Sequence, residues 1–372
     1  MVRGAVYLDW NATAPVRPEA ADALVQALAL CGNPSSVHGG GRQARQRLER
    51  ARAQVATLAG AEPDAVVFTS GGTEANALAL TGIAGYRILV SAIEHDSVRD
   101  AVPGASLIPV TADGIVDLGA LEAMLDSDPR PALVSIMLAN NETGVLQPVG
   151  QAARLVHDRG GLLHCDAVQA AGKIAIDMAA LGADLLTLSA HKLGGAQGVG
   201  ALVTPADIPL AAIQHGGGQE RGRRAGTENL PGIMAFGVAA ELAAAELGAY
   251  RGIAALRDRA EARLIEIAPD ARVFGGSAPR LPNTLCLTMP GVPSATQIMA
   301  LDLAGVMVSA GAACSSGKVR TSRVLTAMGA TEEEAGSAIR ISLGWATAPE
   351  DIDRLVAAWD ALYRRHAFAA CA

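Results

Sequence analysis

Short apolar runs alternate with longer amphipathic stretches over the first two thirds of the chain, and this alternation constrains the fold more than any other feature. The runs cover residues 65–70, 87–92, 106–110, 132–139, 161–166, 184–190 and 200–204. Helix-like segments lie between them, at 41–59, 73–84, 118–126 and 150–159. Near-continuous apolar strands separated by helices are typical of a parallel or mixed sheet covered on both faces, so the pattern predicts an α/β domain.

The pattern changes from about residue 229 onward. An Ala-rich helix (229–248) leads to a charged one (251–267), and a strand-like "NTLCLTM", a helix at 294–304 and a final helix from 349 follow. We therefore expect two domains. Residues 16–248 form the large α/β domain, and residues 1–15 and 249–372 form a smaller α+β domain.

Composition excludes several classes of partner. The 30 basic and 37 acidic side chains give a net charge of −7, which argues against nucleic-acid and anionic-membrane partners. The most apolar long window, "LPGIMAFGVAAELAAAELG", carries Glu241 and Glu246, so we interpret it as a buried helix and not a membrane span. The chain starts without the apolar segment of a secretory signal. Five scattered cysteines without metal-ligand spacing indicate free thiols in a reducing cytoplasm and no metal site.

A lysine stands where one of these apolar runs ends. The segment "DLLTLSAHKLGG" carries Ser189 and His191 directly before Lys192. A solvated surface lysine is the ordinary interpretation. A desolvated lysine instead loses affinity for its proton and becomes a nucleophile toward an aldehyde.

An acid follows another run, in "LLHCDAVQAAGK". Asp166 is expensive to bury without a partner, and a protonated heterocyclic nitrogen would suit it, while Gln169 could bond a phenolic oxygen. Helix capping by Asp166 explains the pattern equally well. Because neighbouring strand residues alternate faces, His164, Cys165 and Asp166 cannot converge on one metal ion.

The segment "FTSGGTEANALAL" suggests a place for a phosphate. Gly71 and Gly72 permit a tight turn, and backbone amides at the helix start, with the Thr73 hydroxyl, would hold one phosphate. An ordinary capped helix, using Thr73 and Glu74, needs the same residues.

Pyridoxal 5′-phosphate requires a nucleophilic lysine, an anion beside its ring nitrogen and a phosphate cup, and the chain offers all three at strand ends. His95, in "SAIEHDSV", could stack on a flat ring, although a structural histidine is the simpler interpretation. Asn140 and Asn141, in "LANNETGVLQP", could hold a cofactor oxygen or a substrate carboxylate, or only shape a turn before Gly144.

Three later segments add candidates. The Gly- and Arg-rich "HGGGQERGRRAGTEN" either wraps an anion, with Thr227 reaching a neighbouring subunit's phosphate, or is a solvated loop. Cys314, in "SAGAACSSGKVR", lies among small residues, where an exposed thiolate could attack. Arg340, in "SAIRISLG", needs an anion, which is either a ligand carboxylate or an internal salt-bridge partner.

These motifs occur in order over almost the whole chain, together with "YLDWNATAP" and "GNPSSVHGGGRQA". The chain thereby resembles the pyridoxal-phosphate cysteine desulfurases of the iron–sulfur-cluster and nitrogen-fixation type. The resemblance implies an aminotransferase-like fold of type I and a homodimer. It also implies that Lys192 binds the cofactor covalently and that Cys314 accepts sulfur.

Further roles follow from the same resemblance. Asp166 would face the ring nitrogen, Gln169 the ring oxygen, and His95 would stack over the ring. Asn141 would hold the cofactor or the substrate carboxylate, and Arg340 the substrate carboxylate. The phosphate would be held by Gly72, Thr73, Ser189, His191 and the partner's Thr227.

The implied reaction is removal of sulfur from L-cysteine, giving L-alanine and a persulfide on Cys314 that passes to an iron–sulfur scaffold or another acceptor. A selenocysteine lyase and a small-amino-acid aminotransferase on the same fold are the alternatives. Trp10 departs from the smaller or tyrosine-like residue of the family, and the tail "HAFAACA" differs from the extended tail of some members.

Overall fold

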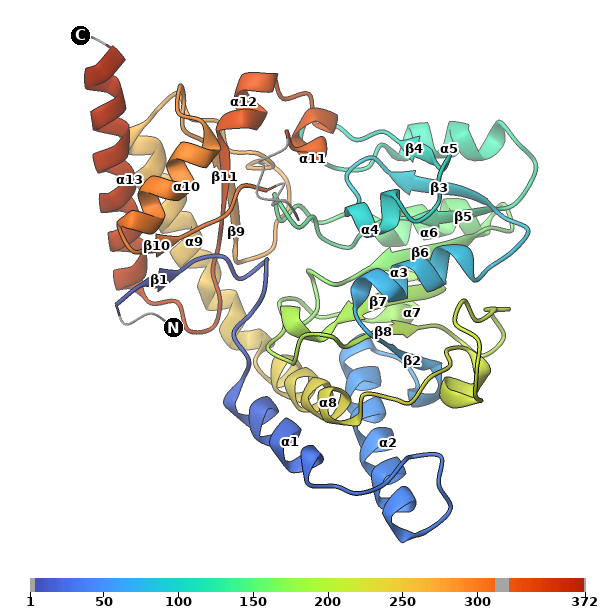
Figure 1. Ribbon diagram of the computed structural model, residues 1–372. Helices are drawn as coiled ribbons and strands as arrows, with labels where there is room; N and C mark the ends of the chain where they lie inside the picture. The colour runs from blue at the N-terminus through green and yellow to red at the C-terminus, as the bar shows by residue number, and fades with distance from the viewer. Residues whose placement is uncertain (1–3, 312–320, 371–372) are drawn as a thin grey trace.

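A mixed sheet forms the centre of the larger half of the molecule (Figure 1). The computed structural model describes residues 4–311 and 321–370, with side chains up to residue 366. The seven strands of this sheet lie in the order β2-β8-β7-β6-β5-β3-β4. They are β2 (Val66–Thr69), β3 (Arg87–Ser91), β4 (Ser106–Ile108), β5 (Ala132–Ser135), β6 (Leu162–Asp166), β7 (Leu185–Ser189) and β8 (Gly200–Val203).

Every strand of the sheet lies inside an apolar run from which the sequence predicts one, and the α/β class is confirmed. All residues of β2, β5, β7 and β8 are buried, as a sheet covered on both faces requires. Only β8 runs antiparallel to its neighbours. The carboxyl ends of β2, β7, β6, β5 and β3 therefore meet at one edge of the sheet, where ligands bind in open α/β folds.

Helices cover both faces of the sheet (Figure 1). On one face, Val67, Leu133 and Leu185 pack against the apolar side of α3 (Gly72–Thr81). The opposite face packs against the remaining large helices. These are α2 (Gly39–Ala59), α5 (Leu118–Asp126), α6 (Val149–His157) and α8 (Leu230–Ala245). The short α4 (Asp96–Arg99) packs on the α3 face through Val98. The other short helices are α7 (Met178–Leu181), η1 (Pro63–Ala65) and η3 (Gln219–Gly222).

The Ala-rich helix α8 is apolar on all sides because it lies between α2 and α1 (Pro18–Leu28), a helix that the periodicity did not predict. Small side chains such as Ala235 and Ala239 are completely buried there. Within the described residues, no single helix is long and apolar enough to cross a membrane. Only α8 and α9 (Leu247–Ile267) taken together would suffice, and they are bent by 71°.

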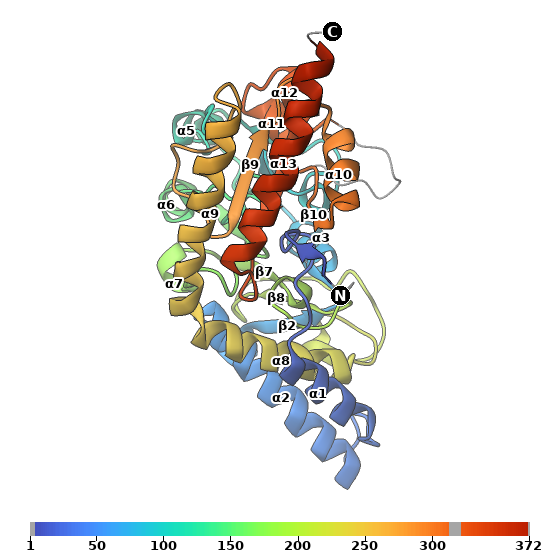
Figure 2. The same cartoon turned by 90° about the vertical axis from the view of Figure 1, so that its left-hand side faces the viewer.

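The smaller half combines the start of the chain with its C-terminal part. Strands β9 (Thr284–Thr288) and β11 (Ala338–Ser342) pair antiparallel, and β1 (Val6–Tyr7) pairs parallel with β10 (Val306–Met307). The helices here are α9, α10 (Ser294–Leu303), α11 (Arg323–Ala327), α12 (Glu332–Ser337) and α13 (Pro349–Ala370). In Figure 2, α9 and α13 run side by side over the sheet. Leu8, Tyr250, Ile341 and Trp359 share a buried core separate from that of the large sheet.

Candidate functional site

A cavity of about 210 Å³ opens at the edge of the sheet where the strands end, and we call it the Lys192 pocket. It collects side chains from segments that follow β2, β3, β5, β6 and β7. The lining residues are Gly72, Thr73, Asn76, His95, Ser97, Met137, Ala139, Asn141, Asp166, Val168, Gln169, Ser189, His191 and Lys192. Nine sequence-based candidates therefore converge on one cavity, namely Gly72, Thr73, His95, Asn141, Asp166, Gln169, Ser189, His191 and Lys192.

Lys192 is largely buried, which excludes the interpretation as a surface lysine. It ends the 3₁₀ turn η2 (Ala190–Lys192) that follows β7. Its Nζ donates to the backbone carbonyls of Asn11 at 2.6 Å and Ala12 at 2.8 Å. Burial, and secondarily the charge of Arg340, lower the pKa of Lys192 to about 8, so about a tenth of the amine is neutral at pH 7. The amine is held in place and is close to its nucleophilic form.

Asp166 ends β6 with its carboxylate fixed at both oxygens. Asn76 donates from Nδ2 to Oδ2 at 2.9 Å, and the backbone N–H of Val168 donates to Oδ1 at 3.0 Å. Asn76 itself is missing from the predicted site. An asparagine inside the apolar helix α3, one turn after Thr73, was the signal that could have revealed it.

The residues beside Asp166 in β6 serve the fold. The buried His164 contacts the hydroxyls of Ser135 and Thr187 at 2.8 and 2.9 Å, and burial lowers its pKa to about 4. Burial also raises the pKa of the Cys165 thiol well above its usual value. No cluster of metal ligands occurs within 4–311 and 321–370.

The start of α3 forms one end of the pocket. A Cβ on Gly72 would lie 3.1 Å from the Val168 side chain, so a larger residue would crowd this turn. The N-cap makes no side-chain hydrogen bond, and Glu74 instead accepts from the backbone N–H of Ser70 at 2.8 Å. Thr73 thus has no capping role and lines the pocket.

His191 borders the same end. Its Nδ1 lies 3.2 Å from the hydroxyl of Thr13, a residue absent from the predicted site. Burial, and secondarily the charge of Lys192, lower the pKa of His191 to about 4, so the ring is neutral at neutral pH. Ser189, the last residue of β7, is buried beside it.

His95, Asn140 and Asn141 have different surroundings in the structure. His95 is exposed, and its Nδ1 accepts from the backbone N–H of Ser97 at 3.1 Å, which fixes the ring as the N-cap of α4. Asn140 shapes the turn, since its Oδ1 accepts from the backbone N–H of Glu142 at 2.9 Å. Asn141 lines the pocket, and its Oδ1 is buried without a hydrogen-bond partner among the described residues.

Gln169 belongs to a buried polar network that the sequence did not reveal. It donates from Nε2 to the carbonyl of Asn11 at 3.0 Å and accepts at Oε1 from Lys173 Nζ at 2.9 Å. Lys173 also donates to Asn11 Oδ1 at 2.9 Å. Asn11 lies 181 positions from Lys192, so no local pattern could link them.

Arg340 forms an internal salt bridge, which is one of the two alternatives that the sequence allowed for it. It lies in β11, and its Nη2 is 2.7 Å from Asp9 Oδ1. Its Nη1 donates to the carbonyl of Asn141 at 3.0 Å. Arg340 does not line the Lys192 pocket, but this bond places it directly beside a residue that does.

Thr227 also does not line the pocket, and nothing is described of Cys314. Thr227 is exposed on the loop after η3 and is not among the lining residues. That loop is anchored by Glu220, whose carboxylate pairs with Arg52 at 2.7 Å and accepts from the backbone N–H of Phe68 at 2.9 Å. Cys314 lies outside the described residues.

Comparison with known proteins identifies the family to which the chain belongs. The model of the aminotransferase class-V family matches residues 6–355. A cysteine desulfurase of Cereibacter sphaeroides is 45% identical, with 94% of each chain covered.

Solved structures extend the similarity to the fold. The NifS-like protein of Rickettsia africae superposes with a TM-score of 0.91 at 36% identity, covering 97% of this chain and 99% of the other. SspA in complex with cysteine gives a TM-score of 0.76 at 28% identity, covering 91% and 98%. The chain therefore belongs to the aminotransferase class-V family and, within it, to the cysteine desulfurases.

Proposed function

We propose that the chain binds pyridoxal 5′-phosphate in the Lys192 pocket and uses it to remove sulfur from L-cysteine, releasing L-alanine. One observation carries the proposal. The buried amine of Lys192 and the fixed carboxylate of Asp166 line a single cavity at the edge where five strands end. A nucleophilic amine and an anion are the two groups that this cofactor needs for its aldehyde and its ring nitrogen.

Unpartnered polar atoms in the pocket fit such a ligand. The Oδ1 atoms of Asn76 and Asn141 are buried without partners among the described residues, and both residues line the cavity. A buried acceptor left unpaired costs about 1–3 kcal/mol, so a ligand that pairs with it gains affinity. The first turn of α3, with Gly72 and Thr73, gives a positive helix end for the phosphate. Ser189 and the neutral His191 border that end.

When bound, the cofactor supplies an aldehyde for the substrate amine and a ring that withdraws electrons from the substrate. Asp166, oriented by Asn76, would pair with the protonated ring nitrogen. Lys192 Nζ would take the proton from the substrate Cα, since its lowered pKa suits a base near neutral pH. The carbonyls of Asn11 and Ala12 would steer that amine by hydrogen bonds.

Substrate and sulfur would be handled by Asn141 of the larger half together with two residues of the C-terminal part. Asn141 and Arg340 would hold the substrate carboxylate, and the hydrogen bond between Arg340 and the Asn141 carbonyl keeps them adjacent. The Cys314 thiolate would attack the substrate sulfur, so that the substrate C–S bond breaks, an S–S bond forms and Cβ takes a proton to give alanine. The terminal persulfide sulfur would then pass to an iron–sulfur scaffold or another acceptor protein.

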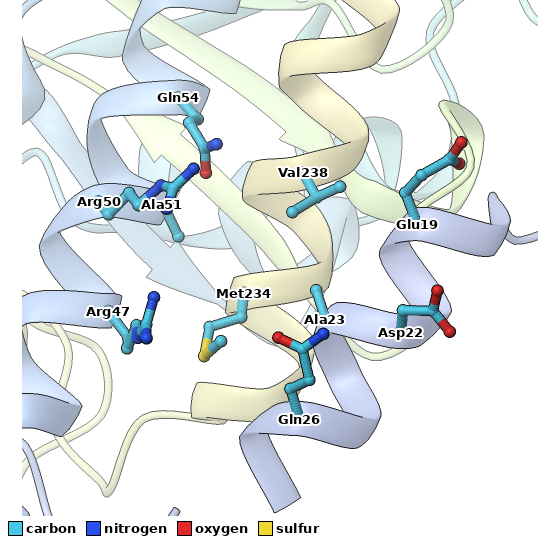
Figure 3. Close-up of a pocket in the computed structure, with 10 residues that line it drawn as sticks. All are labelled: Glu19, Asp22, Ala23, Gln26, Arg47, Arg50, Ala51, Gln54, Met234 and Val238. Atoms are coloured by element: carbon cyan, nitrogen blue, oxygen red, sulfur yellow. The ribbon is translucent and has the colours of Figure 1, made fainter.

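A homodimer follows from the same proposal. Thr227 is exposed away from its own pocket and would complete the phosphate site of a partner. A groove suited to a second copy lies over α8 (Figure 3). Glu19 and Asp22 project from α1 on one side, and Arg47 and Arg50 from α2 on the other. Opposite charges on the two walls would allow two copies to pair around a two-fold axis.

We also propose a cytoplasmic location. Cys31, Cys165 and Cys286 are free thiols, which a reducing compartment preserves.

The test compares the Cys314→Ala variant with wild-type enzyme and with Cys31→Ala, which removes an exposed thiol far along the chain. Purified proteins are loaded with pyridoxal 5′-phosphate and given L-cysteine, and alanine, sulfide and keto acid are quantified. We expect Cys314→Ala to keep the visible absorbance of the bound cofactor and to lose alanine release. Undiminished alanine release by that variant would remove Cys314 from the reaction, and keto-acid formation in place of alanine would indicate an aminotransferase.

A further inference from the structure

A second cavity, of about 370 Å³, lies on the far side of Lys173, and we call it the Arg280 pocket. Its walls come from the segment after β6, the first turns of α9 and the segment that leads into β9. Four cations line it, namely Lys173, Arg251, Arg257 and Arg280. The other lining residues are apolar: Ile174, Ala175, Leu247, Ala254 and Pro282.

Arg280 carries a buried donor with nothing to bind. Its side chain is only 7% exposed, and its Nη2 pairs with Glu261 at 2.8 Å. Its Nη1 is buried and has no hydrogen-bond partner among the described residues. A buried donor is rarely left unpaired in a native protein, so Arg280 has a hydrogen-bonding position still to be filled.

The surrounding charges show what kind of acceptor fits. Lys173 donates to the amide oxygens of Asn11 and Gln169 and has no acidic partner among the described residues. Arg257 pairs with Asp258 at 2.6 Å, and Arg251 is exposed. Several cations around one apolar cavity favour an anion with more than one negative charge.

The volume of the Arg280 pocket further restricts the class of ligand that fits it. A water molecule occupies about 30 Å³ of liquid, so the cavity exceeds a single small ion several-fold. The apolar walls would contact a carbon skeleton, while the guanidinium groups would bind phosphate oxygens.

We propose that the Arg280 pocket binds a small organic phosphate, held by Arg280 and Arg251. The site is distinct from the Lys192 pocket, and the two share no lining residue. They are nevertheless linked, because Lys173 donates to Asn11, whose carbonyl accepts from Lys192. The proposal does not depend on the proposed activity.

Calorimetry with glycerol 3-phosphate tests the proposal on protein already loaded with pyridoxal 5′-phosphate, so that the phosphate end of the Lys192 pocket is filled. We expect saturable binding of one molecule per chain. Arg280→Gln should weaken binding by about tenfold or more, since it removes charge-assisted hydrogen bonds. Arg263→Gln is the matched control, because Arg263 lies on α9 outside the pocket and pairs with Asp353.

A second variant separates a loss of ligand binding from a loss of folding. Arg251 is exposed, so Arg251→Gln should keep the melting temperature of the wild type and still weaken binding. Unsaturable heats with the wild type, or equal affinity in wild type, Arg251→Gln and Arg280→Gln, would overturn the proposal. Inorganic phosphate and citrate serve as further ligands. Weaker binding of both supports an organic phosphate, and equal binding of citrate would contradict that class.

Discussion

The Lys192 pocket and the Arg280 pocket each contain a lysine that donates a hydrogen bond to Asn11. Lys192 shares its pocket with the carboxylate of Asp166 and is also near Asp9, both of which raise its pKa against the effect of burial. Lys173 has no acid among the groups that shift its pKa. Burial, then the charges of Lys192 and Arg340, lower the pKa of Lys173 well below its usual value.

The difference shows that burial alone does not make a lysine reactive. Lys192 stands at a strand end and faces a cavity with an acid across it, so a ligand can reach the amine. Lys173 donates both of its hydrogen bonds to side chains that position the first pocket. We therefore assign covalent chemistry to Lys192 and positioning of Asn11 and Gln169 to Lys173.

The strongest test of this division replaces each lysine in turn. Lys192→Ala should lower alanine release from L-cysteine by about a thousandfold or more, because it removes both the covalent attachment and the base. Lys173→Met should lower it by less than about tenfold, as expected when only two neutral hydrogen bonds are lost. An equal loss in the two variants would contradict the division of roles.

The next prediction concerns the negative charge of Asp166, a feature of the Lys192 pocket that the lining of the Arg280 pocket lacks. Asp166→Asn can keep only one of the two hydrogen bonds that the carboxylate accepts, and it removes the charge. We expect turnover to fall between about a hundredfold and a thousandfold. The measurement is kcat at saturating cysteine and cofactor. Asp184→Asn is the control, since Asp184 accepts from the backbone N–H of Leu163 at the opposite end of β7. A full kcat in Asp166→Asn would mean that no cationic ring faces this residue.

The pKa of Lys192 gives a prediction for stability. It is lowered from 10.5 to about 8 in the folded chain, so the unfolded chain binds more protons between these values. The free energy of unfolding of the cofactor-free protein should therefore gain up to about 3 kcal/mol from Lys192 as pH rises from 8 to 10.5. Denaturant titrations across that range should show a smaller rise for Lys192→Met. Parallel profiles would show that the amine is not desolvated.

Replacing Arg340 is expected to have a smaller effect than replacing Lys192 or Asp166. Arg340→Gln should raise KM for L-cysteine by about tenfold, because one charge-assisted contact to the substrate carboxylate is lost. Steady-state kinetics separate this from an effect on kcat, which should change less. A lower kcat with an unchanged KM would instead assign Arg340 to holding Asp9 and Asn141 in place.

The sequence predicted what depends on local pattern. Apolar runs defined all strands of the large sheet, and strand ends located Lys192, Asp166 and Asn141, because carboxyl ends of parallel strands gather at one edge. Asn11 and Lys173 were missed because their roles arise from contacts across 162 and 181 positions. The two-domain boundary and the roles of Thr227 and Cys314 stay predictions.

Peptide mapping of the enzyme after borohydride reduction tests the central claim most directly. Purified protein loaded with pyridoxal 5′-phosphate is reduced, digested and analysed by mass spectrometry. We predict that Lys192 carries the phosphopyridoxyl group and that Lys173 stays unmodified. A label on Lys173, or an unlabelled Lys192, would contradict the account.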